Sequence, residues 1–250
     1  MLEMINVSVT LDGENGPVEV LKDINLKLEP KKIYVMTGPN GGGKSSIAKT
    51  IMGIFPASTG QVWLDGQDIT ALGITERARL GISYAFQRPP VFKGMTVREF
   101  LSYAAGSAEK PELCDLLFDV GLCAQDYLDR EINASFSGGE LKRIEIASLL
   151  ARDLKIALFD EPEAGIDLWS FRRLTETFEN MNKKYDTTIV IISHQERILQ
   201  LADHVILVAE GRISGITSRD SILSDIKRLD ADCRCRQNCP WGGVSDADCN

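Results

Sequence analysis

The sequence lacks any long run of apolar residues, and no segment approaches the roughly 18 consecutive apolar residues that span a membrane. Its first residues, Met1–Asn6, also lack the basic stretch and the apolar stretch of a secretory signal. Basic residues are not in excess either: the chain has 28 Lys and Arg and 36 Asp and Glu, which gives a formal net charge of −8. Because nucleic-acid phosphates bind basic surfaces, this charge argues against a nucleic-acid partner. We therefore expect a cytoplasmic protein with no direct membrane insertion.

The composition permits one compact folded unit. A chain of 250 residues with 44% hydrophobic content can bury a full α/β core. Apolar runs at 33–37, 156–160, 188–193 and 205–208 predict strands of a parallel sheet that is covered on both faces. The earlier residues alternate as strands do, with Asp65-Gly66 a predicted hairpin turn, so we expect a small antiparallel sheet beside the parallel one.

A glycine-rich segment directly follows the first of these apolar runs and fits G-x-x-x-x-G-K-[ST]. A strand followed by this segment and a helix predicts a P-loop, whose backbone N–H groups and helix N-terminus face a phosphate. Lys44 is expected to neutralise the β- and γ-phosphates, and Ser45 to offer its hydroxyl to Mg²⁺, with Ser46 the weaker alternative. The predicted nucleotide-binding residues here are Gly38, Pro39, Asn40, Gly41, Gly42, Gly43, Lys44, Ser45 and Ser46.

Further motifs follow downstream in a fixed order. Phe136-Ser137-Gly138-Gly139-Glu140 precedes a helical pattern, which places Ser137 at an N-cap. An apolar strand then ends in Asp160-Glu161, and another ends in Ser193-His194. Together with the P-loop, this series resembles the ABC ATPases over nearly the whole chain. The resemblance implies an α/β P-loop NTPase fold of ABC type, with a parallel core sheet, a flanking antiparallel sheet and a helical subdomain.

The resemblance also implies an ATPase and assigns a task to each polar residue. Asp160 would hold Mg²⁺ as the acid at the end of its strand, and Glu161 would polarise the water that attacks the γ-phosphorus. Gln87 resembles the Q-loop residue that contacts both Mg²⁺ and the attacking water. His194 resembles the switch histidine that touches the γ-phosphate.

In this family the signature motif completes the ATP site of the opposite subunit, so Ser137 and Gly139 would bind the γ-phosphate of the partner's ATP. A serine-capped helix N-terminus offers unpaired N–H groups and a favourable dipole to such an anion. The resemblance therefore implies an ATP-dependent homodimer. Asp167 matches the aspartate of the D-loop, although the preceding Glu163–Ile166 departs from the common spelling and leaves its contacts across the dimer less certain.

The domain organisation follows from where the pattern changes. After residue 88 the sequence becomes helical, with the capping box Thr96–Glu99 and a helix that starts at Pro111 and stops at Gly121. The expected parts are the N-terminal part of the ATPase core at 1–88, the helical subdomain at 89–135, the signature motif and C-terminal part of the core at 136–228, and a Cys-rich tail at 229–250.

Three local stretches resemble SufC, the soluble ATPase of SUF iron–sulfur cluster assembly. They are Ala85–Pro90, Phe136–Arg143 and His194–Leu199. This resemblance implies a scaffold partner of the SufB or SufD type, while Leu168–Ser170 and the D-loop depart from ordinary SufC and suggest a divergent or reduced SUF system. The alternative is the ATP-binding subunit of a membrane transporter, and a nucleotide-binding module without turnover is disfavoured because both Glu161 and His194 are present.

Two smaller features complete the expectations. Met1–Ile33 contains no aromatic residue to stack on adenine, so aliphatic Val18 or Val20 would take that place. Of the six cysteines, Cys114 and Cys123 are expected to pack in the helical subdomain. The other four could ligate zinc or an iron–sulfur cluster, or form a tail that is merely rich in cysteine, and they are Cys233, Cys235, Cys239 and Cys249.

Overall fold

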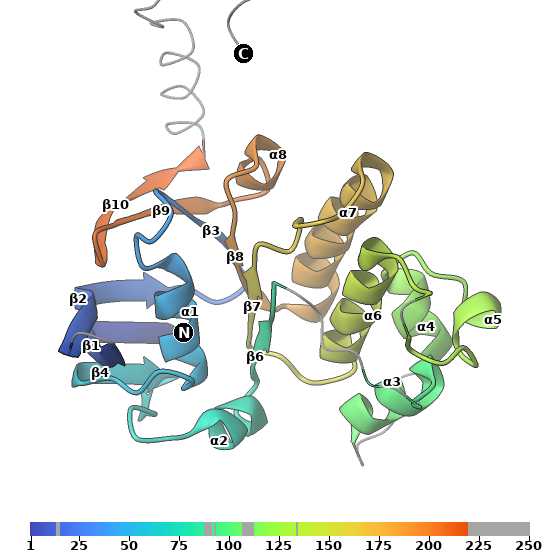
Figure 1. Ribbon diagram of the computed structural model, residues 1–250, viewed down its shortest axis with the longest axis horizontal. Coiled ribbons are helices and arrows are strands. Elements are labelled where there is room, and N and C mark those ends of the chain that lie inside the picture. Colours follow the sequence, from blue (N-terminus) through green and yellow to red (C-terminus); the bar gives the residue numbers. More distant parts are fainter. Residues whose placement is uncertain (14–15, 88–91, 93, 107–112, 134, 220–250) are drawn as a thin grey trace, which may run out of the picture.

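A computed structural model describes residues 1–13, 16–87, 92, 94–106, 113–133 and 135–219. Two sheets stand side by side, and a group of helices forms the opposite end of the molecule (Figure 1). Over these ranges, none of the helices is both long enough and apolar enough to cross a membrane.

The smaller sheet is antiparallel, with strand order β2-β1-β4-β5, as the alternating pattern predicts. Its hairpin turn falls at Asp65 and Gly66, whose φ angles of 51° and 81° are both positive, as a two-residue hairpin of this twist requires. The predicted turn is therefore confirmed. The strands are β1 (Leu2–Gly13), β2 (Gly16–Leu28), β4 (Thr59–Leu64) and β5 (Gln67–Asp68).

The larger sheet has strand order β10-β9-β3-β8-β7-β6. Neighbours from β9 to β6 run parallel, and the four strands expected from apolar runs are all present. Two strands were missed by the sequence analysis: β6, which is short and half polar, and β10, which pairs antiparallel with β9 and makes the sheet mixed. The strands are β3 (Ile33–Thr37), β6 (Ile82–Ala85), β7 (Ile156–Asp160), β8 (Thr188–Ile192), β9 (His204–Ala209) and β10 (Arg212–Ser218).

Alternate residues of the parallel strands enter two separate apolar cores. Leu158 packs with the antiparallel sheet and α1, whereas its neighbours Ala157 and Phe159 pack toward the helical end. Strands that are buried on both faces in this way need continuous apolar runs, which explains why sequence analysis located them.

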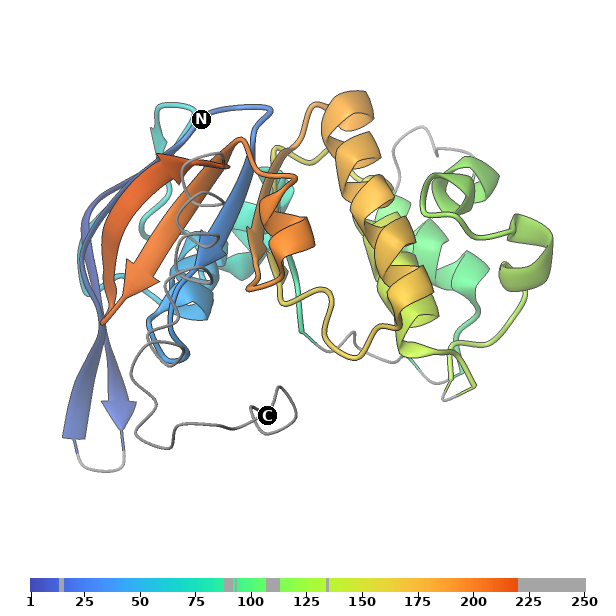
Figure 2. The ribbon, with the colours of Figure 1, turned by 90° about the horizontal axis from the view of Figure 1, so that it is seen from above.

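The helices α3, α4 and α5 lie beyond α6 and α7, away from the antiparallel sheet (Figures 1 and 2). The predicted capping box is confirmed at α3, where the Thr96 hydroxyl accepts from the Glu99 N–H and the Glu99 carboxylate accepts from the Thr96 N–H. The helices are α1 (Lys44–Met52), α2 (Ile74–Arg79), α3 (Val97–Ala105), α4 (Leu113–Asp119), α5 (Ala124–Tyr127), α6 (Gly138–Leu150), α7 (Leu168–Tyr185) and α8 (Glu196–Leu199).

The expectation that Cys114 and Cys123 pack in a core is wrong, because both are exposed. In α4 the buried face is made by Leu116 and Leu117, which places Cys114 on the outer side. Cys123 precedes α5 at its N-cap, and that short helix buries none of its residues.

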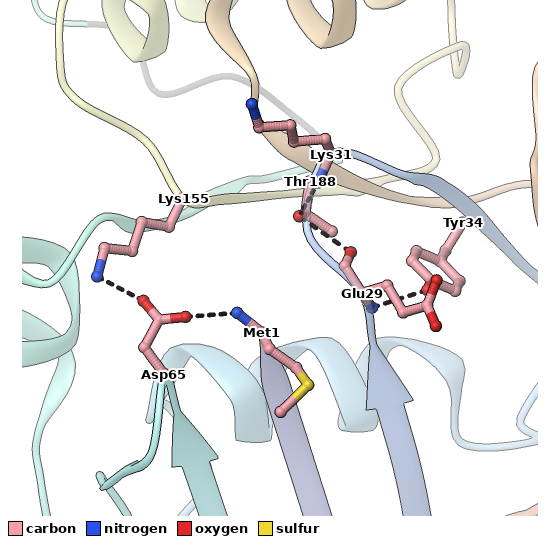
Figure 3. Close-up of polar contacts among 7 residues, drawn as sticks. All are labelled: Met1, Glu29, Lys31, Tyr34, Asp65, Lys155 and Thr188. Carbon is pink, nitrogen blue, oxygen red and sulfur yellow. Dashed lines mark hydrogen bonds and ion pairs between the residues drawn. The ribbon is translucent and has the colours of Figure 1, made fainter.

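Polar contacts join the two sheets near the amino ends of the parallel strands (Figure 3). The Lys155 ammonium, just before β7, lies 2.6 Å from the Asp65 carboxylate in the hairpin turn, and Asp65 also binds the Met1 amine. Before β3, the Lys31 N–H donates to the Thr188 hydroxyl of β8 at 3.0 Å.

Candidate active site

Each of the four neighbouring strands β3, β8, β7 and β6 is followed by one of the predicted motifs. The glycine-rich loop follows β3, His194 follows β8, Asp160 ends β7, and Gln87 follows β6. Because these strands are parallel, their carboxyl ends meet at one edge, which is where open α/β sheets bind ligands. The sheet order therefore gathers motifs that are far apart in the sequence.

The glycine-rich loop has a geometry that only its glycines permit. Gly38 has φ 135°, and a Cβ there would lie 2.0 Å from the carbonyl oxygen of Val208. The buried Lys44 ammonium donates to the carbonyls of Gly38 at 2.8 Å and Pro39 at 2.9 Å, so the lysine closes its own loop. Burial lowers the pKa of Lys44, while the carboxylates of the two acids after β7 act against that shift. The exposed tip of the loop consists of Pro39, Asn40 and Gly41, whereas Gly42 is buried and Gly43 is the N-cap of α1.

Asp160, the last residue of β7, is the buried acid that lies beside the glycine-rich loop. Its Oδ1 accepts a hydrogen bond from the Ser45 hydroxyl at 2.9 Å, and its Oδ2 accepts one from the Tyr84 hydroxyl at 2.5 Å. The Ser46 carbonyl accepts from the Thr50 hydroxyl at 2.8 Å, and among the described residues no hydrogen bond joins the Ser46 hydroxyl to Asp160. The predicted preference for Ser45 over Ser46 agrees with this placement.

The second acid, Glu161, has a left-handed backbone with φ 44° and is anchored by its N–H to the Ile192 carbonyl of β8 at 3.0 Å. Its Oε2 accepts a hydrogen bond from the Gln87 side-chain amide at 2.6 Å. His194 is exposed, and its Nδ1 lies 3.4 Å from the Thr37 hydroxyl at the end of β3. A carboxylate with one amide donor, beside a lysine and a serine hydroxyl, can orient a water toward an anion held by the loop.

The signature residues form a second cluster on α6. The Ser137 hydroxyl accepts from the Glu140 N–H at 3.2 Å, which confirms the predicted N-cap. A Cβ on Gly138 would lie 3.2 Å from the Gly165 carbonyl, so this helix start adjoins the segment that leads to Asp167. Within the parts of the chain that the structure describes, no hydrogen bond joins Ser137 or Gly139 to the glycine-rich loop.

Three polar residues near the site were not identified from the sequence: Lys142 and Glu145, which are buried, and Glu163, which is half-buried. Lys142 and Glu145 of α6 form an ion pair of 2.9 Å. Both also bind the backbone of Phe86: the Lys142 ammonium donates to the Phe86 carbonyl at 2.6 Å, and the Glu145 carboxylate accepts from the Phe86 N–H at 3.2 Å. Glu163 accepts from the Ser193 hydroxyl, and burial raises the pKa of Glu163. The contacts with Phe86 and Ser193 gave no sign in the sequence, because these partners lie 30 to 59 residues away. The Lys142–Glu145 pair itself has the i, i+3 spacing of a local helical ion pair, which could have been found.

Two further expectations concern the contact with adenine and the tail cysteines. Val18 is 53% exposed, whereas Val20 is half-buried and its carbonyl lies 3.5 Å from a Cβ built on Gly43. Adenine contact at either position stays a prediction. The four tail cysteines lie outside the described residues: Cys233, Cys235, Cys239 and Cys249.

Comparisons with known proteins agree with this geometry. The family model described as "ABC transporter" matches residues 21–164. An uncharacterised ABC transporter ATP-binding protein, MJ0035, of Methanocaldococcus jannaschii is 37% identical over 207 residues, which cover 79% of this chain and 82% of that protein. A probable ABC transporter ATP-binding protein of Streptococcus pyogenes serotype M3 is 35% identical over 238 residues, 90% of each chain.

The fold also matches solved structures. A dimeric, post-hydrolysis structure of the ATP-binding cassette MJ0796 bound to ADP and Pi superposes with a TM-score of 0.78 at 19% identity, covering 88% of this chain and 99% of that one. The family model matches more than half of the chain and the relatives cover most of it, so the chain belongs to the ABC transporter family and is an ATPase.

Proposed function

We propose that this ATPase is a SufC-like subunit, which dimerises on ATP and thereby acts on a soluble scaffold of the SufB or SufD type during iron–sulfur cluster assembly. The observation that carries the proposal is the joint occurrence of three SufC-like stretches, Ala85–Pro90, Phe136–Arg143 and His194–Leu199. Each stretch is weak alone, but they lie at the Q-loop, the signature helix and the switch histidine. This function implies a cytoplasmic location.

The chemistry within one subunit is assigned to the cluster at the sheet edge. Ser45 and Asp160 supply a hydroxyl and a carboxylate, the hard oxygen donors that suit Mg²⁺, and their mutual distance of 2.9 Å supports a shared ligand position. When bound, Mg²⁺ neutralises charge on the β- and γ-phosphates. Lys44 and the loop N–H groups hold the same phosphates.

Hydrolysis is assigned to the second acid and its neighbours. Glu161 polarises the attacking water, and its hydrogen bond from Gln87 supports this role because the amide fixes the carboxylate in one orientation. Gln87 would also contact the metal, and His194 would contact the γ-phosphate. Proximity and electrostatic stabilisation of this kind supply most of the catalysis in phosphoryl transfer.

The site is completed by a second copy of the chain. Ser137 and Gly139 at the start of α6 are assigned to the γ-phosphate of the partner's ATP, and Asp167 to contacts across the dimer. Two observations support this assignment. In the described part of one chain, no hydrogen bond joins this cluster to the glycine-rich loop. The N-terminus of α6, which Ser137 caps, also carries the positive end of a helix dipole, which favours an anion.

The scaffold is assigned to the exposed surface where the Q-loop meets the proposed helical subdomain at 89–135. Phe86 is 48% exposed and Phe92 is 42% exposed, although both are large apolar side chains. Apolar residues exposed together next to an active site are typical of partner-binding surfaces. The Cys-rich tail at 229–250 remains a proposal from sequence alone, as a ligand for iron or zinc.

The second candidate is the ATP-binding subunit of a membrane transporter, which uses the same dimer cycle on a permease. The names of the relatives favour it, since both MJ0035 and the streptococcal protein are named ABC transporter ATP-binding proteins. Affinity purification of the tagged chain from its own host separates the two functions. A soluble scaffold that co-purifies and stimulates turnover supports the SufC-like function, whereas stimulation only by a permease in detergent supports the transporter.

The proposed roles predict that Glu161→Gln retains ATP but hydrolyses it slowly, because the water loses its base while the metal ligands remain. Size-exclusion chromatography with light scattering should then show an ATP- and Mg²⁺-dependent dimer. The matched control, Glu161→Gln combined with Ser137→Arg, should stay monomeric because the signature start can no longer accept the partner's phosphate. If Glu161→Gln stays monomeric both alone and with its scaffold, the assignment of Glu161 or of the shared site is wrong.

A further inference from the structure

Tyr84 is a buried tyrosine whose hydroxyl reaches the candidate metal site. It lies in β6, opposite Leu158 of β7, and both side chains belong to the core beneath the antiparallel sheet. Asp160 lies two residues beyond Leu158, so its side chain leaves the same face of the sheet. The tyrosine ring therefore runs along β7 and presents its hydroxyl to the Asp160 carboxylate.

The two carboxylate oxygens of Asp160 have separate partners. Oδ1 faces the P-loop and accepts from Ser45 at 2.9 Å, while Oδ2 faces β6 and accepts from Tyr84 at 2.5 Å. Tyr84 is 9% exposed and Asp160 is 8% exposed, so water competes little for either bond. A hydrogen bond from a hydroxyl to a buried carboxylate at this distance is charge-assisted and strong. It holds the plane of the carboxylate in one orientation.

We propose that Tyr84 is a positioning residue of the metal site: its hydroxyl holds Oδ2 of Asp160 and so keeps Oδ1 directed toward Ser45. The inference rests on the assignment of Asp160 to the metal in the proposed function. In many metalloproteins, a residue that does not itself bind the metal hydrogen-bonds a metal ligand and so fixes the orientation of that ligand. A carboxylate oxygen can only accept and a tyrosine hydroxyl can donate, so in this contact Tyr84 is the donor to Oδ2.

The test is Tyr84→Phe, which removes one oxygen and keeps the ring that packs edge-on to Phe86 at 4.9 Å between centroids. Mn²⁺ is the probe, and its nucleotide-dependent binding is measured by electron paramagnetic resonance with a non-hydrolysable ATP analogue. Binding of a fluorescent ATP analogue without metal is measured in parallel. We expect Mn²⁺ to bind the variant about 10- to 100-fold more weakly, the usual effect of losing such a partner, with metal-free nucleotide binding unchanged.

Tyr34→Phe is the matched control. Tyr34 is another buried tyrosine of the same core, and its hydroxyl accepts from the Glu29 N–H at 2.8 Å, remote from Asp160. This variant should leave Mn²⁺ binding unchanged. The inference on Tyr84 is overturned if Tyr84→Phe binds Mn²⁺ as the parent does, or if it weakens metal-free nucleotide binding to the same extent, since a general loss of structure affects both.

Asp160→Asn separates the failure of this inference from failure of the proposed site. If Asp160→Asn loses nucleotide-dependent Mn²⁺ binding while Tyr84→Phe retains it, Asp160 is a metal ligand and only the role of Tyr84 is wrong. If Asp160→Asn binds Mn²⁺ normally, the metal assignment of the proposed function is wrong, and the role of Tyr84 is wrong with it.

Discussion

Arg77 is a fully buried charged side chain, and its removal should destabilise the helix that carries Lys44 and Ser45. The side chain is 1% exposed in α2 and lies under the C-terminal end of α1. Its guanidinium donates to the carbonyls of Thr50 at 2.7 Å and Ile51 at 2.9 Å. It also donates to the carbonyls of Leu72 at 2.9 Å and Thr70 at 3.0 Å. The last carbonyls of α1, which have no partner within the helix, are thus paired by Arg77.

The size of the effect follows from these contacts. Arg77→Met keeps much of the apolar stem but removes the guanidinium from four carbonyls, of which that of Thr50 still accepts from the Gly53 N–H at 3.1 Å. A hydrogen bond to a charged group contributes about 1.5–3 kcal/mol to stability. The variant also no longer buries a cation, which offsets part of that loss, so the contributions of the four hydrogen bonds cannot simply be added. Removing one side of a buried charged network costs about 3–5 kcal/mol, which we take as the expected loss. For a chain of this size the midpoint of thermal unfolding should fall by roughly 6–20 °C.

Urea unfolding of the nucleotide-free protein, followed by circular dichroism, measures the loss without a contribution from bound ATP. Arg79→Met, two residues along the same helix and exposed, is the control and should be nearly neutral. Arg77→Lys should recover only part of the loss, because an ammonium cannot reach carbonyls on both sides of the guanidinium plane. A loss below about 1 kcal/mol for Arg77→Met would refute the idea that these hydrogen bonds hold the end of α1.

Two further predictions concern the buried acids. Lys142→Met should lower the free energy of unfolding by about 3–5 kcal/mol, because burial raises the pKa of Glu145 and the variant removes the ammonium that offsets the cost of burying this carboxyl. Adding Glu145→Gln should restore part of the loss in a double-mutant cycle. Burial raises the pKa of Glu163 in the folded protein. The neutral carboxyl therefore contributes its full stability below the ordinary glutamate pKa of about 4.3, and this contribution is lost as the pH rises through the pKa of Glu163 in the folded protein. Glu163→Gln should therefore gain stability over the parent protein as the pH rises, and equal pH profiles in urea unfolding would contradict this.

The sequence could predict the motifs whose chemistry is local. A P-loop needs glycines, a lysine and a serine at fixed spacing, and the structure places Lys44 and Ser45 as that spacing requires. The N-cap at Ser137 and the hairpin turn at Asp65 are local in the same sense. Each depends on backbone angles within a few residues, which is the range over which residue type decides conformation.

Contacts between distant residues could not be predicted in this way. Tyr84 and Asp160 are 76 residues apart, and a tyrosine in a short strand gives no sign that its hydroxyl meets an acid. The same holds for Cys114, whose exposure depends on which face of α4 turns toward α6. Apolar composition alone assigned it to the core, whereas the positions of Leu116 and Leu117 decide the buried face.

Helix α6 connects two parts of the proposed catalytic cycle. Ser137 caps its start, and one to two turns later Lys142 and Glu145 hold the peptide of Phe86, the residue before Gln87. The pair is buried, so separating it from the Phe86 peptide would expose two charges to an apolar interior at a cost of several kcal/mol. A helix is stiff over this length, and a displacement of Phe86 therefore moves Ser137 with it. A partner bound at the exposed ring of Phe86, as the proposed function has it, would therefore act on Gln87, which contacts Glu161, and on the serine assigned to the opposite ATP.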